Sequence, residues 1–162
     1  MIEEVFGFEP LSVSNRSEAM AWLREDWGGE TMVLRGEAVN MSCAKGVCAF
    51  EGGALVGLAT YRFLSDACEL LSLNSRAQGR GLGSALMQQV EQIAKAAGCT
   101  HMLLITTNDN TDALRFYQRR GYDIINIFRD ALDAVRRLKP AVPTIGLHGI
   151  ALRHEIELAK PL

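Results

Sequence analysis

The chain has 162 residues, of which 48% are apolar and 22% are charged, and its net charge is −2. These values are ordinary for a soluble globular protein, and the lack of a basic excess argues against a nucleic-acid partner. No stretch reaches the ~20 apolar residues that a membrane-spanning helix needs, and the acidic start MIEEVFGFEP has no signal-peptide core. We therefore expect one domain over residues 1–162 and no membrane partner.

The cysteines indicate neither a metal nor a disulfide framework. Cys43, Cys48, Cys68 and Cys99 have no CxxC spacing and no pair of histidines nearby. Scattered single thiols are typical of the reducing cytoplasm, and we expect the protein there. We expect no metal cofactor.

The first half of the chain has the pattern of strands around one helix. Residues 17–25 predict this helix, with Ser17 as its N-cap. Residues 46–64 predict a hairpin that turns at Gly52-Gly53. Further strands are expected at residues 5–13, 31–36 and 68–73, and the last of them has the apolar run of a strand that is covered on both faces.

Strands and helices alternate in the second half. A helix is expected over residues 82–97, followed by Gly98 as its stop, and another over 111–120 with Asn110 as N-cap and Gly121 as stop. A third helix begins at Asp130 and ends at Pro140, with acids in its first turn and bases in its last. The expected strands are residues 101–107, 122–128 and 149–158.

This order of elements predicts the fold class. A strand–helix–strand crossover makes the strands at 68–73 and 101–107 parallel neighbours. The earlier hairpin makes the rest of the sheet antiparallel. The chain is therefore expected to form an α/β (α+β) fold with a mixed, largely antiparallel sheet and a central parallel strand pair.

The segment QGRGLG at residues 78–83 lies between a predicted strand and a predicted helix. Such a glycine-rich turn suits the phosphates of a dinucleotide, a nucleoside triphosphate or coenzyme A. A dinucleotide motif expects a last glycine where Ser84 stands, although Asp109 could imitate its ribose-binding acid at a looser spacing. A triphosphate loop needs a lysine that this segment lacks.

A second motif favours coenzyme A. Together, QGRGLGSAL (78–86) and NDNTDALRFYQRRGY (108–122) resemble the GNAT superfamily of N-acetyltransferases. The matching positions are Gln78, Gly81 and Gly83 in the first motif and Asn110, Ala113, Tyr117, Gly121 and Tyr122 in the second. Ser75 stands where the family commonly has a proline before the loop. The C-terminal tail is similar to that of an uncharacterised bacterial subgroup.

The resemblance implies a fold with helices on both faces of the sheet and acetyl-CoA as acyl donor. Backbone N–H groups of residues 78–84 would hold the pyrophosphate, since the glycines allow a close approach and the helix dipole favours an anion. Arg80, and by extension Arg76, would add charge-assisted bonds, with plain surface solvation as the alternative. The implied cofactor-binding residues are Leu71, Ser72, Leu73, Gln78, Gly79, Arg80, Gly81, Leu82, Gly83, Ser84, Asn110, Ala113 and Tyr117.

The reaction that the family implies is direct acetyl transfer to a primary amine within a ternary complex. Tyr117 matches the general acid that protonates the leaving sulfur, with a packed aromatic residue as the alternative. Glu69 stands where the family often has a general base, with an exposed strand end as the alternative. Backbone N–H groups near Leu71–Leu73 could stabilise the oxyanion. Asn110 could bond the pantetheine arm or cap its helix, and Ala113 would leave room for the cofactor.

Several alternatives stay open. His148 or Glu155 could meet the acceptor or line a solvated strand edge. A non-catalytic acetyl-CoA sensor and a nucleotide-dependent oxidoreductase remain rival functions. The acceptor could be an amino acid, a polyamine, an antibiotic, a peptide N-terminus or a protein lysine. A homodimer also stays open, because the last predicted strand offers an edge.

Overall fold

A computed structural model describes residues 5–162, and residues 1–4 of the acidic start lie outside the described residues. The chain forms two compact units. In the described chain, unit 1 comprises residues 5–31, 40–102 and 162, and unit 2 comprises residues 32–39 and 103–161. No helix among the described residues is long and apolar enough to cross a bilayer. That residues 1–162 form a single domain stays a prediction.

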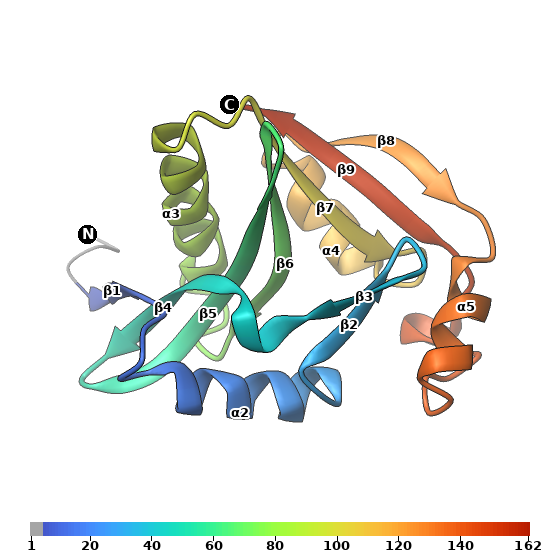
Figure 1. Cartoon of the computed structure of the whole chain (residues 1–162), viewed down its shortest axis with the longest axis horizontal. Coiled ribbons are helices and arrows are strands. Elements are labelled where there is room, and N and C mark those ends of the chain that lie inside the picture. Colours follow the sequence, from blue (N-terminus) through green and yellow to red (C-terminus); the bar gives the residue numbers. More distant parts are fainter. Residues whose placement is uncertain (1–4) are drawn as a thin grey trace. The chain divides into compact units, whose positions relative to one another are not determined.

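Unit 1 contains four antiparallel strands in the order β1-β4-β5-β6 (Figure 1). The predicted hairpin is confirmed. It turns at Gly52 and Gly53, whose φ angles of 57° and 81° lie in the left-handed region that glycine adopts without strain. The strands predicted near residues 5–13 and 68–73 are also present. The bounds are β1 (Gly7–Pro10), β4 (Lys45–Glu51), β5 (Ala54–Leu64) and β6 (Ala67–Ser75).

Helix α3 (Leu82–Ala96) packs closely on this sheet. A Cβ atom at Gly57 of β5 would lie 2.9 Å from the Leu86 side chain and 3.0 Å from the Leu82 side chain. Glycine at this position therefore lets the helix approach the strand. The predicted stop is confirmed, since Gly98 follows the helix with φ 87°.

Helix α2 (Arg16–Trp27) begins at a different cap from the predicted one. Its N-cap residue is Asn15, and Ser17 is an exposed residue of the first turn. The buried Asn15 side chain accepts a hydrogen bond from the Ser12 N–H (2.7 Å), which closes the turn before the helix. The choice of Ser17 was wrong because both residues suit a cap, and the turn at Ser12 decides between them.

Unit 2 contains the strand order β7-β9-β8. The last strand therefore lies between two others and is not the edge that the sequence analysis expected. Helix α4 is confirmed with its predicted N-cap, Asn110, and with Gly121 after it at φ 89°. Helix α5 follows β8 as expected. The bounds are β7 (His101–Thr107, whose first two residues belong to unit 1), α4 (Thr111–Gln118), β8 (Asp123–Phe128), α5 (Ala131–Leu138) and β9 (Glu155–Pro161).

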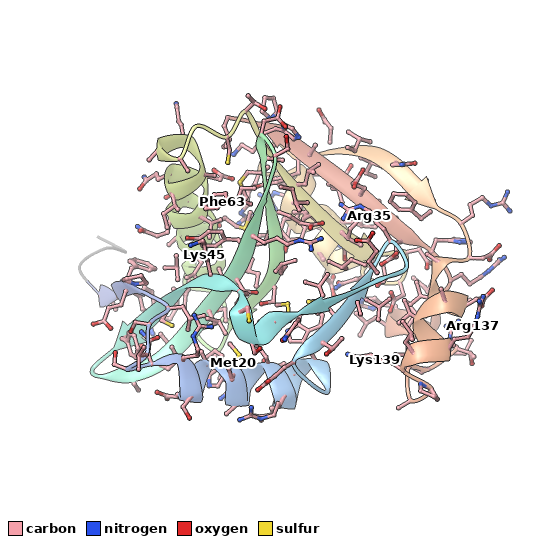
Figure 2. The ribbon with its side chains drawn as sticks, in the orientation of Figure 1. Met20, Arg35, Lys45, Phe63, Arg137 and Lys139 are labelled. Atoms are coloured by element: carbon pink, nitrogen blue, oxygen red, sulfur yellow. The ribbon has the colours of Figure 1, made fainter. Side chains whose placement is uncertain are left out.

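A hairpin of β2 (Thr31–Leu34) and β3 (Glu37–Asn40) adds a second, small sheet, and the sequence pattern predicted only its first strand. β3 was missed because three of its four side chains are exposed and its apolar signal is weak. At the turn, Arg35 (labelled in Figure 2) donates from Nε to Glu157 Oε2 of β9 at 2.8 Å. This ion pair ties the hairpin to the last strand inside unit 2.

The last strand begins later than predicted. It starts at Glu155 rather than Gly149. A 3-10 turn, η2 (Leu147–Gly149), precedes it, and His148 and Gly149 both have positive φ angles, of 58° and 71°. Such angles break an extended strand. The irregular segment contributes Leu152 to the core of unit 2, which also contains Val33, Leu132 and Val135.

Candidate active site

The predicted site residues fall into two groups. Unit 1 holds Glu69, Leu71–Leu73 and the loop at 78–84, whereas unit 2 holds Asn110, Ala113 and Tyr117 on α4 and its cap.

A β-bulge interrupts β6 in the segment that was predicted to lie beside the pantetheine arm. Thr60 of β5 pairs with Ser72, but Tyr61 pairs with Leu70, so Leu71 is an extra residue without an opposite partner in β5. Such a residue is left out of the regular ladder, and the strand bends there. The bulge therefore supplies backbone groups outside the β5–β6 ladder at the predicted position.

Next to the bulge lies a polar strip of four side chains: Thr60, Arg62, Glu69 and Ser72. The Thr60 and Ser72 hydroxyls are buried and 2.5 Å apart. The register places Thr60 opposite Ser72 and Arg62 opposite Glu69, so all four lie on one face of the sheet. Because side chains alternate along a strand, this face is opposite to the one on which α3 covers Gly57.

Glu69 is fully buried, which excludes an exposed strand end as its role. Its Oε2 accepts a hydrogen bond from Arg62 Nε at 2.8 Å, and the Arg62 side chain is 29% exposed. A buried carboxylate is costly without such a partner. The guanidinium thus balances the charge of the predicted base and holds its orientation.

The loop at residues 78–84 has the conformation that an anion cradle needs. Gly79 and Gly81 adopt φ angles of 73° and 77°, and Gly81 is the N-cap of α3 without a side-chain cap bond. The first N–H groups of a helix have no acceptor within it, and they carry the positive end of its dipole. Residues 78–81 are exposed, Leu82 is buried, and Gly83 and Ser84 are half-buried. A groove opens beside Gly81 along Ser84, Ala85 and Gln88.

Both arginines near the loop are paired with protein groups. Arg80 donates from Nη1 and Nη2 to the two carboxylate oxygens of Glu51, at 2.9 and 2.7 Å. This hydrogen bonding lowers the pKa of Glu51 and raises that of Arg80. Arg76 lies over the Trp22 ring, 3.8 Å from its centroid, and donates to Glu25 at 3.0 Å. Arg80 thus lies at the loop but shares its guanidinium with Glu51, whereas Arg76 is held against α2.

In unit 2, Asn110 serves as a helix cap. Its Oδ1 accepts a hydrogen bond from the Ala113 N–H at 3.1 Å. The carbonyl end of the amide is therefore engaged, and no described residue accepts a hydrogen bond from its Nδ2. Ala113 is half-buried.

Tyr117 is 9% exposed and packs edge-on against two aromatic rings. The Phe116 centroid is 5.2 Å from the Tyr117 centroid, and the Tyr122 centroid is 5.7 Å away. Burial raises the pKa of Tyr117 to about 12, although Arg120 partly opposes the shift. The phenol therefore stays protonated at neutral pH, as a proton donor must.

The other candidate groups of unit 2 make protein contacts. His148 is exposed, and its Nε2 lies 3.1 Å from Asp112 Oδ2 on α4. Glu155 is 2% exposed and accepts a hydrogen bond from the Arg35 N–H at 3.0 Å. Glu155 therefore anchors the β2–β3 turn and does not line a solvated strand edge.

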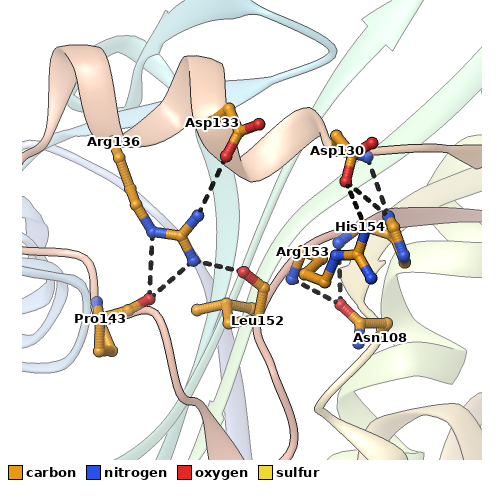
Figure 3. Close-up of polar contacts among 8 residues, drawn as sticks. All are labelled: Asn108, Asp130, Asp133, Arg136, Pro143, Leu152, Arg153 and His154. Atoms are coloured by element: carbon orange, nitrogen blue, oxygen red, sulfur yellow. Dashed lines mark hydrogen bonds and ion pairs between the residues drawn. The ribbon is translucent and has the colours of Figure 1, made fainter.

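The sequence analysis gave no structural role to Asn108 and Asp109, but both hold other segments at the end of β7. Asn108 Oδ1 accepts from the N–H groups of Arg153 and His154 at 2.9 and 2.8 Å, and Asn108 Nδ2 donates to the Ala151 carbonyl at 2.8 Å. Figure 3 shows Asn108 beneath Arg153. These bonds replace the strand ladder that was predicted for residues 151–154.

Asp109, which could have imitated a ribose-binding acid, has a structural role. It is 4% exposed and accepts hydrogen bonds from Thr107 Oγ1 (2.5 Å) and the Leu147 N–H (2.9 Å). A Cβ at Gly146 would lie 2.1 Å from its Oδ2. The carboxylate is thus enclosed by the loop that it holds. The run NDN after a strand is a turn signal, but nothing in it points to a contact almost forty residues away.

Residues 8–122 match the model of the acetyltransferase (GNAT) family. The chain belongs to this family. A relative from Bacillus subtilis (strain 168), the uncharacterised protein YdhI, is 41% identical over 135 residues, which cover 83% of this chain and 84% of the relative. As a member of the GNAT family, the chain carries an acyltransferase domain.

Solved structures share its fold. The IAA acetyltransferase of Bacillus cereus ATCC 14579 superposes with a TM-score of 0.76 at 22% identity, over 97% of this chain and 99% of that one. A GNAT acetyltransferase of Elizabethkingia anophelis, crystallised with acetyl-CoA, gives 0.73 at 16% identity over 98% and 99%. The predicted fold class is therefore confirmed as a mixed, largely antiparallel sheet with one parallel strand pair and flanking helices.

Proposed function

We propose that this GNAT protein transfers the acetyl group of acetyl-CoA to a primary amine by direct attack within a ternary complex. The observation that carries the proposal is the loop at residues 78–84, where left-handed glycines lead into the uncapped N-terminus of α3. This arrangement suits a pyrophosphate. Bound acetyl-CoA would supply an activated thioester carbonyl, and the protein would align an amine with it.

The bulge in β6 supports a position for the reacting carbonyl next to Leu71–Leu73. Leu71 has no partner in β5, so the strand departs there from the β5–β6 ladder, and the proposal places the ligand at this departure. Donors aimed at the oxygen on which negative charge develops lower the barrier. Leu71–Leu73 would hold the arm, and their N–H groups would stabilise the oxyanion.

The proton balance of the transfer needs one acceptor and one donor. The amine arrives as an ammonium ion and must lose a proton before its lone pair forms the new C–N bond. Glu69, held by Arg62, would take this proton through water. As the C–S bond breaks, the sulfur must be protonated, and the neutral phenol of Tyr117 would donate that proton.

A non-catalytic acetyl-CoA sensor is the second candidate. It is favoured by the fact that Glu69 is bound by Arg62 and Arg80 by Glu51, so two of the proposed functional side chains already have partners. Such a protein would use the same loop but would not turn over.

Calorimetric titration with acetyl-CoA and with NADH, followed by a panel of amines with detection of free CoA thiol, tests these functions. Binding of acetyl-CoA together with amine-dependent thiol release supports the transferase. Binding without release from a panel of amino acids, polyamines, aminoglycosides, peptides and lysine-containing proteins supports the sensor. Binding of NADH alone would support an oxidoreductase and overturn the proposal.

The free thiols support the cytoplasm as the site of this activity. All four cysteines are unpaired, and Cys43 is exposed. An exposed thiol persists in a reducing compartment.

A further inference from the structure

Arg62 is the side chain of the polar strip that reaches solvent. The other three, Thr60, Glu69 and Ser72, are at most 3% exposed, whereas the Arg62 side chain is 29% exposed. Arg62 donates from Nε to Glu69, and no described residue accepts a hydrogen bond from its Nη1 or Nη2. The edge of the guanidinium between these two nitrogens is therefore open to a ligand.

An open guanidinium edge of this kind fits a carboxylate. Its two nitrogens donate parallel N–H bonds with the spacing of the two carboxylate oxygens. If Arg62 only balanced the charge of Glu69, this edge would simply be hydrated. Two features of the polar strip favour a ligand instead.

The first feature is a buried hydroxyl that has a hydrogen to donate. The Thr60 and Ser72 oxygens are 2.5 Å apart, so the hydrogen of one hydroxyl lies between them and the hydrogen of the other points elsewhere. No described residue accepts this second hydrogen. Ser72 belongs to the segment proposed to lie beside the thioester, and Arg62 follows Thr60 by about 6–7 Å along β5. Donors for a ligand therefore extend from the proposed reaction centre to Arg62.

The second feature is the order of the charges. The Glu69 carboxylate is buried, and the positive guanidinium of Arg62 is the part of the pair that solvent reaches. An amino acid has the complementary order when its ammonium ion points toward Glu69 and its carboxylate toward Arg62. A polyamine would instead bring a second cation to the guanidinium, and like charges repel. The strip therefore favours an amine that carries a carboxylate.

We propose that Arg62 selects the acceptor by binding its carboxylate, and that the acceptor is a small amine of the amino-acid class. This inference rests on the proposed acetyl transfer, because it assigns the acceptor of that reaction. The Nη1–Nη2 edge of Arg62 holds the carboxylate, while Nε keeps its bond to Glu69. One side chain thus selects the substrate and directs its amine toward the proposed base.

Binding of reaction products tests the proposal without turnover. With saturating CoA present, N-acetyl-amino acids and their amides are screened by thermal shift, and the acid that binds most tightly is compared with its own amide by calorimetry. We expect the acid to bind roughly tenfold or more tightly, because the amide lacks the charge and one of the acceptor oxygens. Failure of every acid to bind, or equal affinities for acid and amide, overturns the proposal.

Paired substitutions assign the selectivity to Arg62. Glu69→Gln keeps the guanidinium and should keep the preference for the acid, whereas Arg62→Gln/Glu69→Gln should lose it. The double variant leaves no unpaired buried charge, so it avoids the destabilisation expected of Arg62→Gln alone. Arg24→Gln/Glu30→Gln neutralises another ion pair of unit 1 and is the matched control, which should keep the preference.

A preference for the acid that survives in Arg62→Gln/Glu69→Gln overturns the proposal. Circular dichroism checks that each variant folds. Arg62→Lys serves if the double variant does not fold, because lysine keeps the charge but loses the paired donors. This variant should reduce the preference several-fold, and an unchanged preference would equally overturn the proposal.

Thiol release separates this inference from the proposed function. With amino acids and their amides as acceptors, wild type should show a kcat/KM roughly tenfold or more higher for the acids. Acid-selective product binding without thiol release from any amine would overturn the transferase and leave the carboxylate site. Thiol release with equal kcat/KM for acids and amides would leave the transferase and overturn the carboxylate site.

Discussion

The two units contribute their candidate groups in different ways. In unit 1 the main features are backbone ones: the left-handed glycines before α3 and the bulge at Leu71. In unit 2 they are side chains on and around α4, where Asn110 caps the helix and Tyr117 packs among aromatic rings. A backbone site depends on residues next to each other in sequence. A side-chain site depends on residues that are distant in sequence. The catalytic role of such a side chain is therefore harder to distinguish from a packing role.

The largest expected effect tests the side-chain part. Tyr117→Phe keeps the packed ring and removes only the hydroxyl. We expect turnover to fall by roughly 10²–10⁴-fold with acetyl-CoA affinity unchanged, because general acid catalysis is lost. Tyr122→Phe removes a hydroxyl from the neighbouring ring, 5.7 Å away, and serves as control. Equal turnover in the two variants, measured by thiol release, would make Tyr117 a packing residue.

The next prediction concerns the backbone part. Gly81→Glu places a side chain and a negative charge at the proposed pyrophosphate cradle, so acetyl-CoA binding should weaken by about a hundredfold or more. Gly98→Glu is the control, because Gly98 has a similar φ, 87°, at the other end of α3. Both variants carry similar backbone strain, and only Gly81→Glu should lose binding by calorimetry. Equal affinities would exclude this loop as the binding site.

A third prediction asks whether the units unfold together. Gly146→Ala drives a methyl group into the Asp109 carboxylate of unit 2 and should destabilise the protein by roughly 2 kcal/mol. Both tryptophans, Trp22 and Trp27, lie in unit 1. If residues 1–162 form a single cooperative domain, the tryptophan fluorescence midpoint in urea should shift together with the circular dichroism midpoint.

Two results would argue against this account. A tryptophan midpoint that stays unchanged while circular dichroism shifts would mean that the units unfold separately. The same loss of stability from Gly146→Ala in an Asp109→Ala background would mean that the clash with the carboxylate is not its cause.

The fourth prediction concerns the proposed base. Glu69→Gln keeps the size of the side chain and removes its basicity. A lysine-like amine has a pKa of about 10.4, so the variant should lose turnover most at low pH, by about tenfold, and recover partly as rising pH frees the amine. Glu18→Gln, on an exposed position of α2, should keep the wild-type pH profile. A Glu69→Gln profile parallel to that of wild type would leave water as the base.

The smallest effect follows from the raised pKa of Tyr117. The unfolded phenol has a pKa near 10 and the folded one about 12, so between these values the unfolded chain releases a proton that the native chain keeps. This contribution to stability is complete below pH 10 and is lost as the pH rises toward 12. From pH 8 to pH 11, the free energy of unfolding measured in urea should fall by about 1 kcal/mol less in Tyr117→Phe than in wild type. Equal losses would mean that the phenol ionises normally.

Local patterns in the sequence predicted most of the elements and the family. The helix at 82–97, its stop at Gly98 and the Gly52-Gly53 turn were confirmed, because spacing and left-handed glycines act over a few residues. The two motifs led to the GNAT family, whose model matches residues 8–122. β3 was missed because an exposed strand leaves little periodic signal. β9 was placed six residues too early because the residues before it are held by hydrogen bonds to the Asn108 side chain, which leave no periodic signal either.

By itself, the sequence determined which segments become helices and strands, and it determined the glycine loop, because these depend on neighbours along the chain. Only the tertiary structure decided what surrounds each candidate side chain. Arg62 binds Glu69 because two strands set the register, Glu51 at the end of β4 binds Arg80 in the loop before α3, and Asp109 binds Leu147 through a loop that closes on it. Burial, charge balance and pKa arise from such contacts between residues far apart in sequence, and no local pattern encodes them.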